Sequence, residues 1–172
     1  MLISNEWLKD YVNVDQSVQA LAERITRTGI EVDDIIDYTK DIKKLVVGHV
    51  LSKTPHPDAD KLNICQVDLG EEEPVQIVCG APNVDEGQHV IVAKVGGRLP
   101  GGIKIKRAKL RGERSEGMIC SLQEIGISSH VTPKNYESGI YVFPEAVKPG
   151  TDALEAIYPV SYTHLRAHET PE

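Results

Sequence analysis

Apolar residues recur at two different periods along the chain. Near its start they follow helical spacing, which predicts a short helix over residues 5–11 and a second that begins after Asp15 and ends before Gly29. The apolar positions of the second helix are Val18, Leu21, Ala22 and Ile25. From residue 45 the period becomes two, the spacing of a half-buried strand. The chain therefore opens with a helical appendage and continues as β structure.

Four strands are predicted in the β part, over residues 45–53, 61–69, 75–79 and 89–95. The segments between them are rich in Pro, Gly and Asn, which form tight turns. Short strands separated by such turns over about a hundred residues are typical of a small Greek-key barrel. We therefore expect a mainly β protein with a small helical appendage.

The fifth predicted strand, over residues 103–111, contains a slip in the alternation. Two isoleucines alternate with lysines before the slip, and an alanine and a leucine turn inward in the opposite phase after it. A one-residue slip moves every later side chain to the other face unless an extra residue is absorbed. We therefore predict a β-bulge at residues 106–107. The bulge would keep one basic outer face made of Lys104, Lys109, Arg111 and at least one of the two bulge residues.

Further elements are predicted on either side of the fifth strand and toward the end of the chain. The glycine-rich residues 96–102 are expected to form a loop that carries Arg98. Ser121 and Glu124 match a capping box, which predicts a short helix from Ser121. Residues 139–144 read as a last strand.

The final residues show neither periodicity nor a partner segment, so we expect a non-native tail and leave it out of the fold. The expected domains are an appendage over 1–39, a barrel domain over 40–150, the start of a following region over 151–158, and this tail over 159–172.

Charge gives the strongest functional signal. The chain has a formal net charge of −7, yet residues 94–114 hold eight Lys or Arg residues against one Glu. We call residues 94–114 the basic segment. A basic surface on an acidic chain indicates an anionic partner, and RNA phosphate is the leading candidate, with a merely solvated face as the alternative. With Lys61 and Ser115 added, the candidate RNA-binding residues are Lys61, Lys94, Arg98, Lys104, Lys106, Arg107, Lys109, Arg111, Arg114 and Ser115.

Amino-acid composition indicates whether the chain would bind single-stranded or structured RNA, and whether it could bind a metal or form disulfides. The chain has one Trp and one Phe, so aromatic side chains on which single-stranded bases could stack are scarce. Structured RNA that is recognised by its shape fits better.

His56, Asp58 and Asp60 form either a metal cluster or, as we favour, a turn in which these side chains cap backbone amides. We expect no catalytic residue and no metal. Three unclustered cysteines fit a reducing cytoplasm, and we expect no membrane or DNA partner.

Three phrases of the sequence resemble the tRNA-binding OB-fold domain: HPDADKL at 56–62, VCGAPN at 78–83 and KLRGERSEGMICS at 109–121. The opening phrases SNEWLKDYV at 4–12 and TGIEV at 28–32 resemble the bacterial phenylalanyl-tRNA synthetase beta-subunit family. The resemblance implies an OB-fold, a five-stranded Greek-key barrel of the nucleic-acid-binding type. It also implies a non-catalytic module that captures or orients tRNA during ATP-dependent phenylalanyl-tRNA aminoacylation.

The same resemblance implies the surroundings of the module. In that family the active site lies on a separate alpha subunit, so we expect an N-terminal fragment without a catalytic domain. Its partners would be tRNA and the alpha subunit of an alpha2beta2 assembly, in the cytoplasm. ATP and Mg²⁺ would serve the whole enzyme, and no cofactor is expected in this fragment. Two alternatives stay open: a structural brace or protein-interaction domain within the synthetase, and a free-standing tRNA-binding chaperone-like protein.

Overall fold

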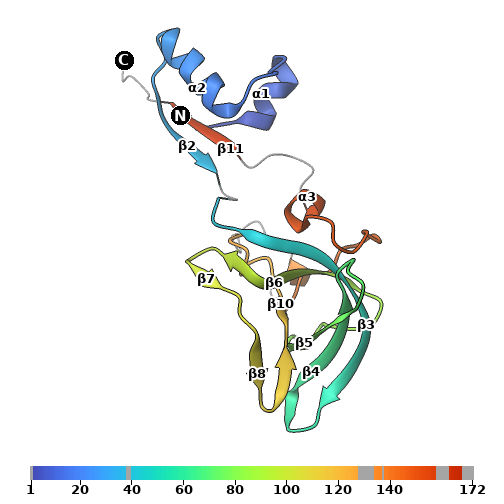
Figure 1. The fold of residues 1–172 in the computed structure, drawn as a ribbon. Coiled ribbons are helices and arrows are strands. Elements are labelled where there is room, and N and C mark those ends of the chain that lie inside the picture. The colour runs from blue at the N-terminus through green and yellow to red at the C-terminus, as the bar shows by residue number, and fades with distance from the viewer. Residues whose placement is uncertain (1, 38–39, 128–133, 137, 158–162, 168–172) are drawn as a thin grey trace. The chain divides into compact units, whose positions relative to one another are not determined.

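The computed structural model describes residues 2–37, 40–127, 134–136, 138–157 and 163–167. The chain forms two compact units, one of residues 1–40 with 158–172 and one of residues 41–157 (Figure 1). No helix in these described ranges is long and apolar enough to cross a membrane.

The first unit combines two helices with a three-stranded sheet. Helix α1 (Asn5–Tyr11) has the predicted bounds, and α2 (Val18–Arg27) is followed by Gly29 at φ +102°. The N-cap of α2 is Ser17 and not the predicted Asp15, because the Ser17 hydroxyl accepts the Ala20 N–H at 3.3 Å. The sheet has the order β1-β11-β2, with β1 at Leu2–Ser4, β2 at Val32–Asp37 and β11 at Thr163–Ala167.

Strand β11 corrects one prediction about the end of the chain. No partner segment was expected for residues 159–172, yet β11 lies within them and pairs antiparallel with both β1 and β2. The physical reason is that β1 and β2 each present unpaired backbone groups, which a strand of almost any sequence can satisfy.

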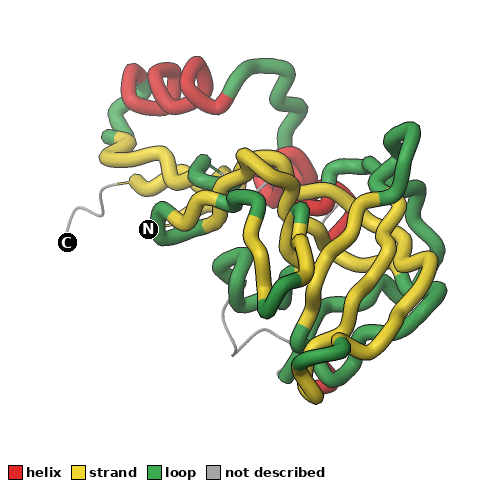
Figure 2. The backbone as a smooth tube through the Cα atoms, turned by 60° about the horizontal axis from the view of Figure 1, so that its bottom comes forward, coloured by secondary structure: helices red, strands yellow, loops and turns green. Residues whose placement is uncertain are grey.

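The second unit contains the barrel. Its five-strand ladder has the order β10-β6-β3-β4-β5. The strands are β3 (Lys43–His56), β4 (Ala59–Asp68), β5 (Val75–Cys79), β6 (His89–Leu99) and β10 (Gly117–Ile119). Three consecutive antiparallel strands with the fourth lying beside the first form the predicted Greek key. The ladder curls on itself (Figure 2). Its core consists mainly of aliphatic side chains and buried cysteines.

The two end strands of the ladder approach each other without forming a ladder of their own. The Glu116 N–H donates to the Gln76 carbonyl at 2.8 Å, and the Val78 N–H donates to the Ser115 hydroxyl at 3.1 Å. Between the described strands the sheet therefore stays open along one seam, and the unit is an OB-like barrel with the predicted mainly β character.

The predicted fifth strand is two separate strands. Strand β7 (Ile103–Lys104) pairs with β6, whereas β8 (Ala108–Leu110) pairs with β9 (Glu113–Ser115). The interruption lies at the predicted place, but it is a change of partner and not a bulge within one ladder. The fifth strand of the ladder is β10 instead. A register shift does occur beside Lys44, whose φ is +56°.

Two local predictions near this region were wrong. Ala108 and Leu110 are exposed and not inward, because the β8–β9 hairpin projects from the ladder without a covering layer on that face. Residues 96–99 belong to β6 and not to a loop, because Gly96 and Gly97 exchange backbone hydrogen bonds with Ile105 at 2.8 and 2.9 Å.

After β10 the chain has little regular structure. The capping box forms as predicted, with Ser121 N–H donating to the Glu124 carboxylate at 2.7 Å and Glu124 N–H to the Ser121 hydroxyl at 3.2 Å. These bonds close a turn and not a helix. The predicted last strand is reduced to one bridge, Val90 with Val142. The remaining elements are a 3-10 helix, η1 (Lys134–Tyr136), and α3 (Ala153–Ile157).

Candidate nucleic-acid interface

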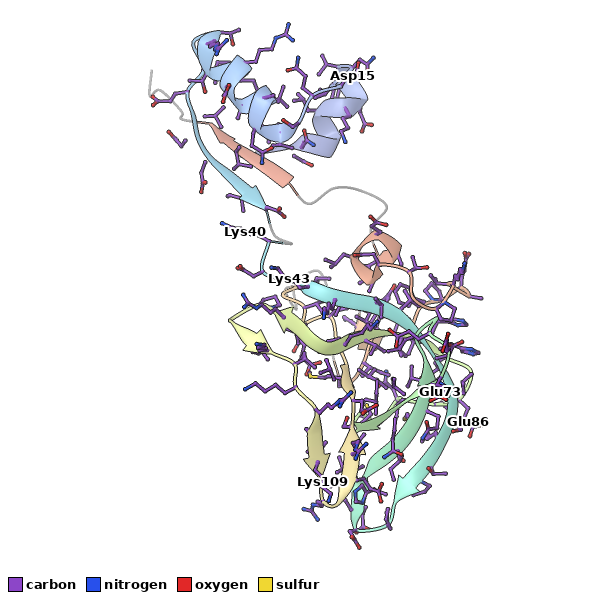
Figure 3. All side chains as sticks on the ribbon, viewed as in Figure 1. Asp15, Lys40, Lys43, Glu73, Glu86 and Lys109 are labelled. Atoms are coloured by element: carbon purple, nitrogen blue, oxygen red, sulfur yellow. The ribbon has the colours of Figure 1, made fainter. Side chains whose placement is uncertain are left out.

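The basic residues predicted from sequence lie on successive strands and turns of the second unit. Most of them are exposed: Lys61 on β4, Arg98 on β6, Lys104 on β7, Lys106 and Arg107 after it, Lys109 on β8, Arg111 in the following turn and Arg114 on β9. Figure 3 labels Lys43 at the start of β3 and Lys109 on β8. Long-range strand pairing brings several of these cations opposite one another.

The first group of cations crosses three neighbouring strands. Arg98 is the register partner of Lys43 on one side and of Lys104 on the other, and all three residues are exposed. Residues directly opposite each other in a sheet project from the same face. Like charges in this position repel, so the row lowers the stability of the free sheet and favours an anion over it.

The second group lies on the β8–β9 hairpin. Lys109 and Arg114 are register partners and both are exposed. The turn between the strands is made by Arg111 at φ +48° and Gly112 at φ +92°. Positive φ at both central residues identifies a type I′ turn, the form that matches the twist of a two-residue hairpin. The hairpin therefore presents three cations within six residues of chain, from Lys109 to Arg114.

Two basic residues are already paired with acids. Lys94, which is half-buried, forms an ion pair with Glu71. The Arg107 Nε lies 3.4 Å from a carboxylate oxygen of Glu116. A phosphate would have to compete with these carboxylates, although pairs at such exposure contribute little to stability. Lys94 and Arg107 are therefore weaker candidates for contact with phosphate than the cations of the first and second groups.

Ser115 is not available to a ligand. Its side chain is 3% exposed, and its hydroxyl accepts the Val78 N–H at 3.1 Å and donates to the Gly117 carbonyl at 3.0 Å. Both hydrogen-bonding functions of the hydroxyl are therefore used to join β9 to β5 and β10. This burial argues against the predicted contact of Ser115 with phosphate, because strand alternation turns its side chain into the seam.

Sequence reasoning missed Lys43 and Lys44. Both are exposed and stand at the start of β3, far in sequence from the basic segment. A Cβ added at Gly96 would lie 3.1 Å from the Lys44 Nζ, so this lysine reaches over β6. Two lysines before an apolar run carry no signal for this placement, since only the β3–β6 pairing creates it.

The hydrogen bonds of the turn between β3 and β4 support the interpretation that its polar side chains cap backbone amides. His56 is 5% exposed, and its Nδ1 accepts the Asp58 N–H at 3.0 Å. Its Nε2 lies 3.0 Å from the Leu110 carbonyl. Both ring nitrogens are thus engaged by backbone groups. Within the described ranges, no group of three or more His, Cys, Asp or Glu side chains is arranged to hold a metal.

The cysteines are buried core residues. Burial raises the pKa of the Cys120 thiol to about 12, with the nearby Glu124 carboxylate adding to the rise. Burial likewise raises the pKa of Cys65 to about 11, and the neighbouring Cys79 contributes. Cys79 is shifted in the same direction, again chiefly by burial. These thiols stay protonated near neutral pH and are poor nucleophiles.

Comparison with known proteins connects this geometry to a family. Residues 45–152 match the family model described as "Putative tRNA binding domain". Over 158 residues, or 92% of this chain, the sequence is 99% identical to a phenylalanine–tRNA ligase beta subunit of Staphylococcus epidermidis. It is 83% identical over the same length to the corresponding subunit of Staphylococcus aureus. The chain spans 20% of the length of each of these curated relatives.

Two solved structures are similar at lower identity. The C-terminal domain of p43 from Plasmodium vivax matches with a TM-score of 0.45 and 24% identity, covering 67% of this chain and 61% of that one. A MetRS-related protein from Pyrococcus horikoshii matches with a TM-score of 0.43 and 22% identity, covering 62% of this chain and 85% of that one.

Proposed function

The chain belongs to the tRNA-binding domain family, and from this premise we propose that its exposed cations capture and orient tRNA through contacts to phosphate. The proposed contacts are made by the exposed basic side chains of the second unit. They are Lys43, Arg98 and Lys104 of the first group, Lys109 and Arg114 of the second group, and Lys61, Lys106 and Arg111. Lys94 and Arg107 would join once phosphate displaces their carboxylate partners. The module itself carries out no chemistry in this proposal.

One observation supports the proposal above the others: cations are placed directly opposite cations on paired strands. Lys43, Arg98 and Lys104 form one such row, and Lys109 with Arg114 forms another. A solvated face without a polyanionic partner gains nothing from this register, since like charges repel. Phosphates spaced along RNA relieve the repulsion and release counterions on binding.

The experiment that tests the proposal is tRNA binding by the full 172-residue chain across a salt series. We expect the logarithm of affinity to fall linearly with the logarithm of salt concentration. The double substitution Lys104→Glu with Lys109→Glu should weaken binding and reduce the magnitude of the slope by roughly one to two, because each lost phosphate contact removes about 0.7–0.9 from it.

A matched control keeps the total charge change the same. Lys134→Glu with Lys148→Glu alters two exposed lysines outside both rows and outside the basic segment. This variant should keep a slope close to that of the parent chain. Equal effects from the two double variants would refute the assignment. A folded chain that binds no tRNA at low salt would instead favour a structural brace whose basic face meets acidic protein surface.

We further propose the setting of the module from its near-identity to part of a beta subunit. The whole protein would be the beta subunit of a phenylalanine–tRNA ligase that works in the cytoplasm with an alpha subunit, in an alpha2beta2 assembly. ATP and Mg²⁺ would be used by that assembly and not by this module. We also propose that residues 40–150 act as the functional domain, with 1–39 as an appendage and 151–158 leading into the following region.

A further inference from the structure

Two hairpin tips of the second unit are joined by hydrogen bonds. One is the turn between β3 and β4, and the other is the turn between β8 and β9 (Figure 1). The His56 Nε2 lies 3.0 Å from the Leu110 carbonyl, and an Arg111 guanidinium nitrogen donates to the Asp58 carbonyl at 3.2 Å. Residues more than fifty positions apart in sequence thus meet at one end of the barrel.

The geometry around His56 fixes the state of its ring. A backbone N–H can only donate, so the Nδ1 that meets the Asp58 N–H at 3.0 Å must be an unprotonated acceptor. A backbone carbonyl can only accept, so the Nε2 must carry the proton that meets the Leu110 carbonyl. The two hydrogen bonds therefore define one tautomer, with the proton on Nε2. The ring connects its own turn to β8.

The β8–β9 hairpin depends on such connections. A two-stranded hairpin is marginally stable in water, and the three residues of β8 are all exposed. On the β9 side, the Gln76 amide donates to the Arg114 carbonyl at 2.9 Å and to the Glu113 carboxylate at 3.3 Å. On the β8 side, the hydrogen bonds that join strand and turn to the rest of the described barrel are those made by His56 and Arg111.

We propose that the two tips act as one RNA-binding edge and that His56 is the positioning residue that joins them. The inference rests on the proposed function, because the ligand is the same tRNA. The edge presents Lys61 from β4 with Lys109, Arg111 and Arg114 from the hairpin. His56 itself does not contact RNA, since its side chain is buried and both nitrogens are occupied.

Positioning affects affinity because an ordered hairpin does not have to be immobilised on binding. A hairpin that moves against β3–β4 samples many arrangements of its three cations, and binding must select one of them. The net contribution of one hydrogen bond corresponds to about a threefold to tenfold change in an equilibrium constant. Loss of the bond to Leu110 should therefore weaken tRNA binding by about five- to tenfold.

Two substitutions separate the two hydrogen bonds of the ring. In His56→Asn the short side chain can still accept the Asp58 N–H, in the manner of an Asx turn, but cannot reach Leu110. In His56→Gln the longer amide can still donate to the Leu110 carbonyl but no longer accepts from Asp58. Asp58 and Leu110 are both exposed, so water can satisfy the abandoned group and each variant should fold.

The experiment measures tRNA affinity of the full 172-residue chain with unfractionated tRNA, together with urea unfolding to confirm the fold. We expect the H56N variant to lose about five- to tenfold in affinity and the H56Q variant to stay within about twofold. Amide hydrogen exchange in β8 and β9 should accelerate in H56N and not in H56Q. Equal affinities for both variants and the parent chain would overturn the positioning role while leaving the proposed function standing.

A double-mutant cycle distinguishes positioning from a general effect on the fold. In a background with Lys109→Gln and Arg114→Gln, the hairpin has lost two of its cations and its position matters less. There the additional H56N substitution should change affinity by less than about twofold. An undiminished loss in that background would contradict action through the hairpin. Absence of any tRNA binding by the folded parent chain would overturn the proposed function and this inference together.

Discussion

Residue surroundings decide which of the candidate RNA-binding side chains are exposed. Arg114 and Ser115 are adjacent in β9, yet Arg114 is exposed and Ser115 is 3% exposed. Alternation along a strand sends neighbours to opposite faces, and the seam between β9 and β5 lies on the Ser115 side. A hydroxyl in this position supports the fold and not the interface.

Replacing Ser115 by alanine should therefore affect stability and not RNA recognition. The substitution leaves the buried Val78 N–H without its acceptor, which costs about 1–3 kcal/mol in the free energy of unfolding. Urea unfolding measures this loss. tRNA affinity, expressed per folded molecule, should stay the same. Ser138→Ala, at an exposed position, serves as the control with little effect on either quantity. A fall in affinity at unchanged stability would restore Ser115 as an RNA contact.

At the scale of elements, the pairing of β3 with β6 creates features that neither strand predicts alone. His49 and His89 are register partners, and their rings stack with centroids 4.5 Å apart and planes 3° from parallel. Partial burial lowers the pKa of His89, and the neighbouring His49 lowers it further. The folded chain thus binds a proton at His89 less readily than the unfolded chain does.

This linkage predicts loss of stability in mild acid. Because the folded pKa lies below the unfolded value of about 6.5, the unfolded state binds more protons and stability rises with pH. Stability should therefore decline as pH falls from about 7 through 6.5 to the lowered value of His89, and this contribution should then level off. Urea unfolding across pH 5–8 would measure it. The double variant His49→Gln with His89→Gln should show a flatter profile over the same range, and an unchanged profile would exclude the pair.

Element bounds were predictable where side-chain alternation continued and not where glycine interrupted it. Strand β5 spans the predicted residues 75–79, and α1 spans the predicted 5–11. Strand β6 runs four residues beyond its predicted end, through Gly96 and Gly97. A Cβ at Gly97 would lie 2.7 Å from the Lys43 carbonyl, so glycine here permits close strand approach. Sequence alone does not distinguish such a glycine from one in a loop.

At the scale of the whole molecule, charge is divided between the units. Residues 1–39 hold three basic and eight acidic residues, whereas the basic segment lies in residues 41–157. Separated charges interact over about 10 Å at 0.1 M ionic strength and over about 30 Å at 0.01 M. The acidic unit should therefore weaken attraction of a polyanion mainly at low salt.

We expect the isolated residues 41–157 to fold cooperatively and to bind tRNA more tightly than the full chain at low salt. The difference should disappear as salt rises above physiological concentration, because screening removes the long-range repulsion. Thermal unfolding and the same salt series measure both parts of the prediction. An excised unit without a cooperative transition would show that the barrel needs the rest of the chain. An affinity difference that persists at high salt would point to direct contacts made by the first unit.

The sequence by itself determined the β-rich character of the second unit and the concentration of basic residues in it. Strand alternation, turn residues and the basic segment are local properties, so they can be read from neighbouring positions in the chain. They predicted the Greek key, the approximate positions of its first four strands with the bounds of β5, and nine exposed or partly exposed cations.

Only the tertiary structure decided which cations share a face and which polar residues are used internally. The pairing of Lys43 with Arg98 and the bond from His56 to the Leu110 carbonyl each join positions more than fifty residues apart in sequence. Strand pairing at that separation depends on the packing of the complete core, because each pair is stabilised together with its neighbours and not by its own residues. For the same reason Ser115 faces the seam and β8 leaves the ladder, although the local sequence favoured a ligand contact and a continuous strand.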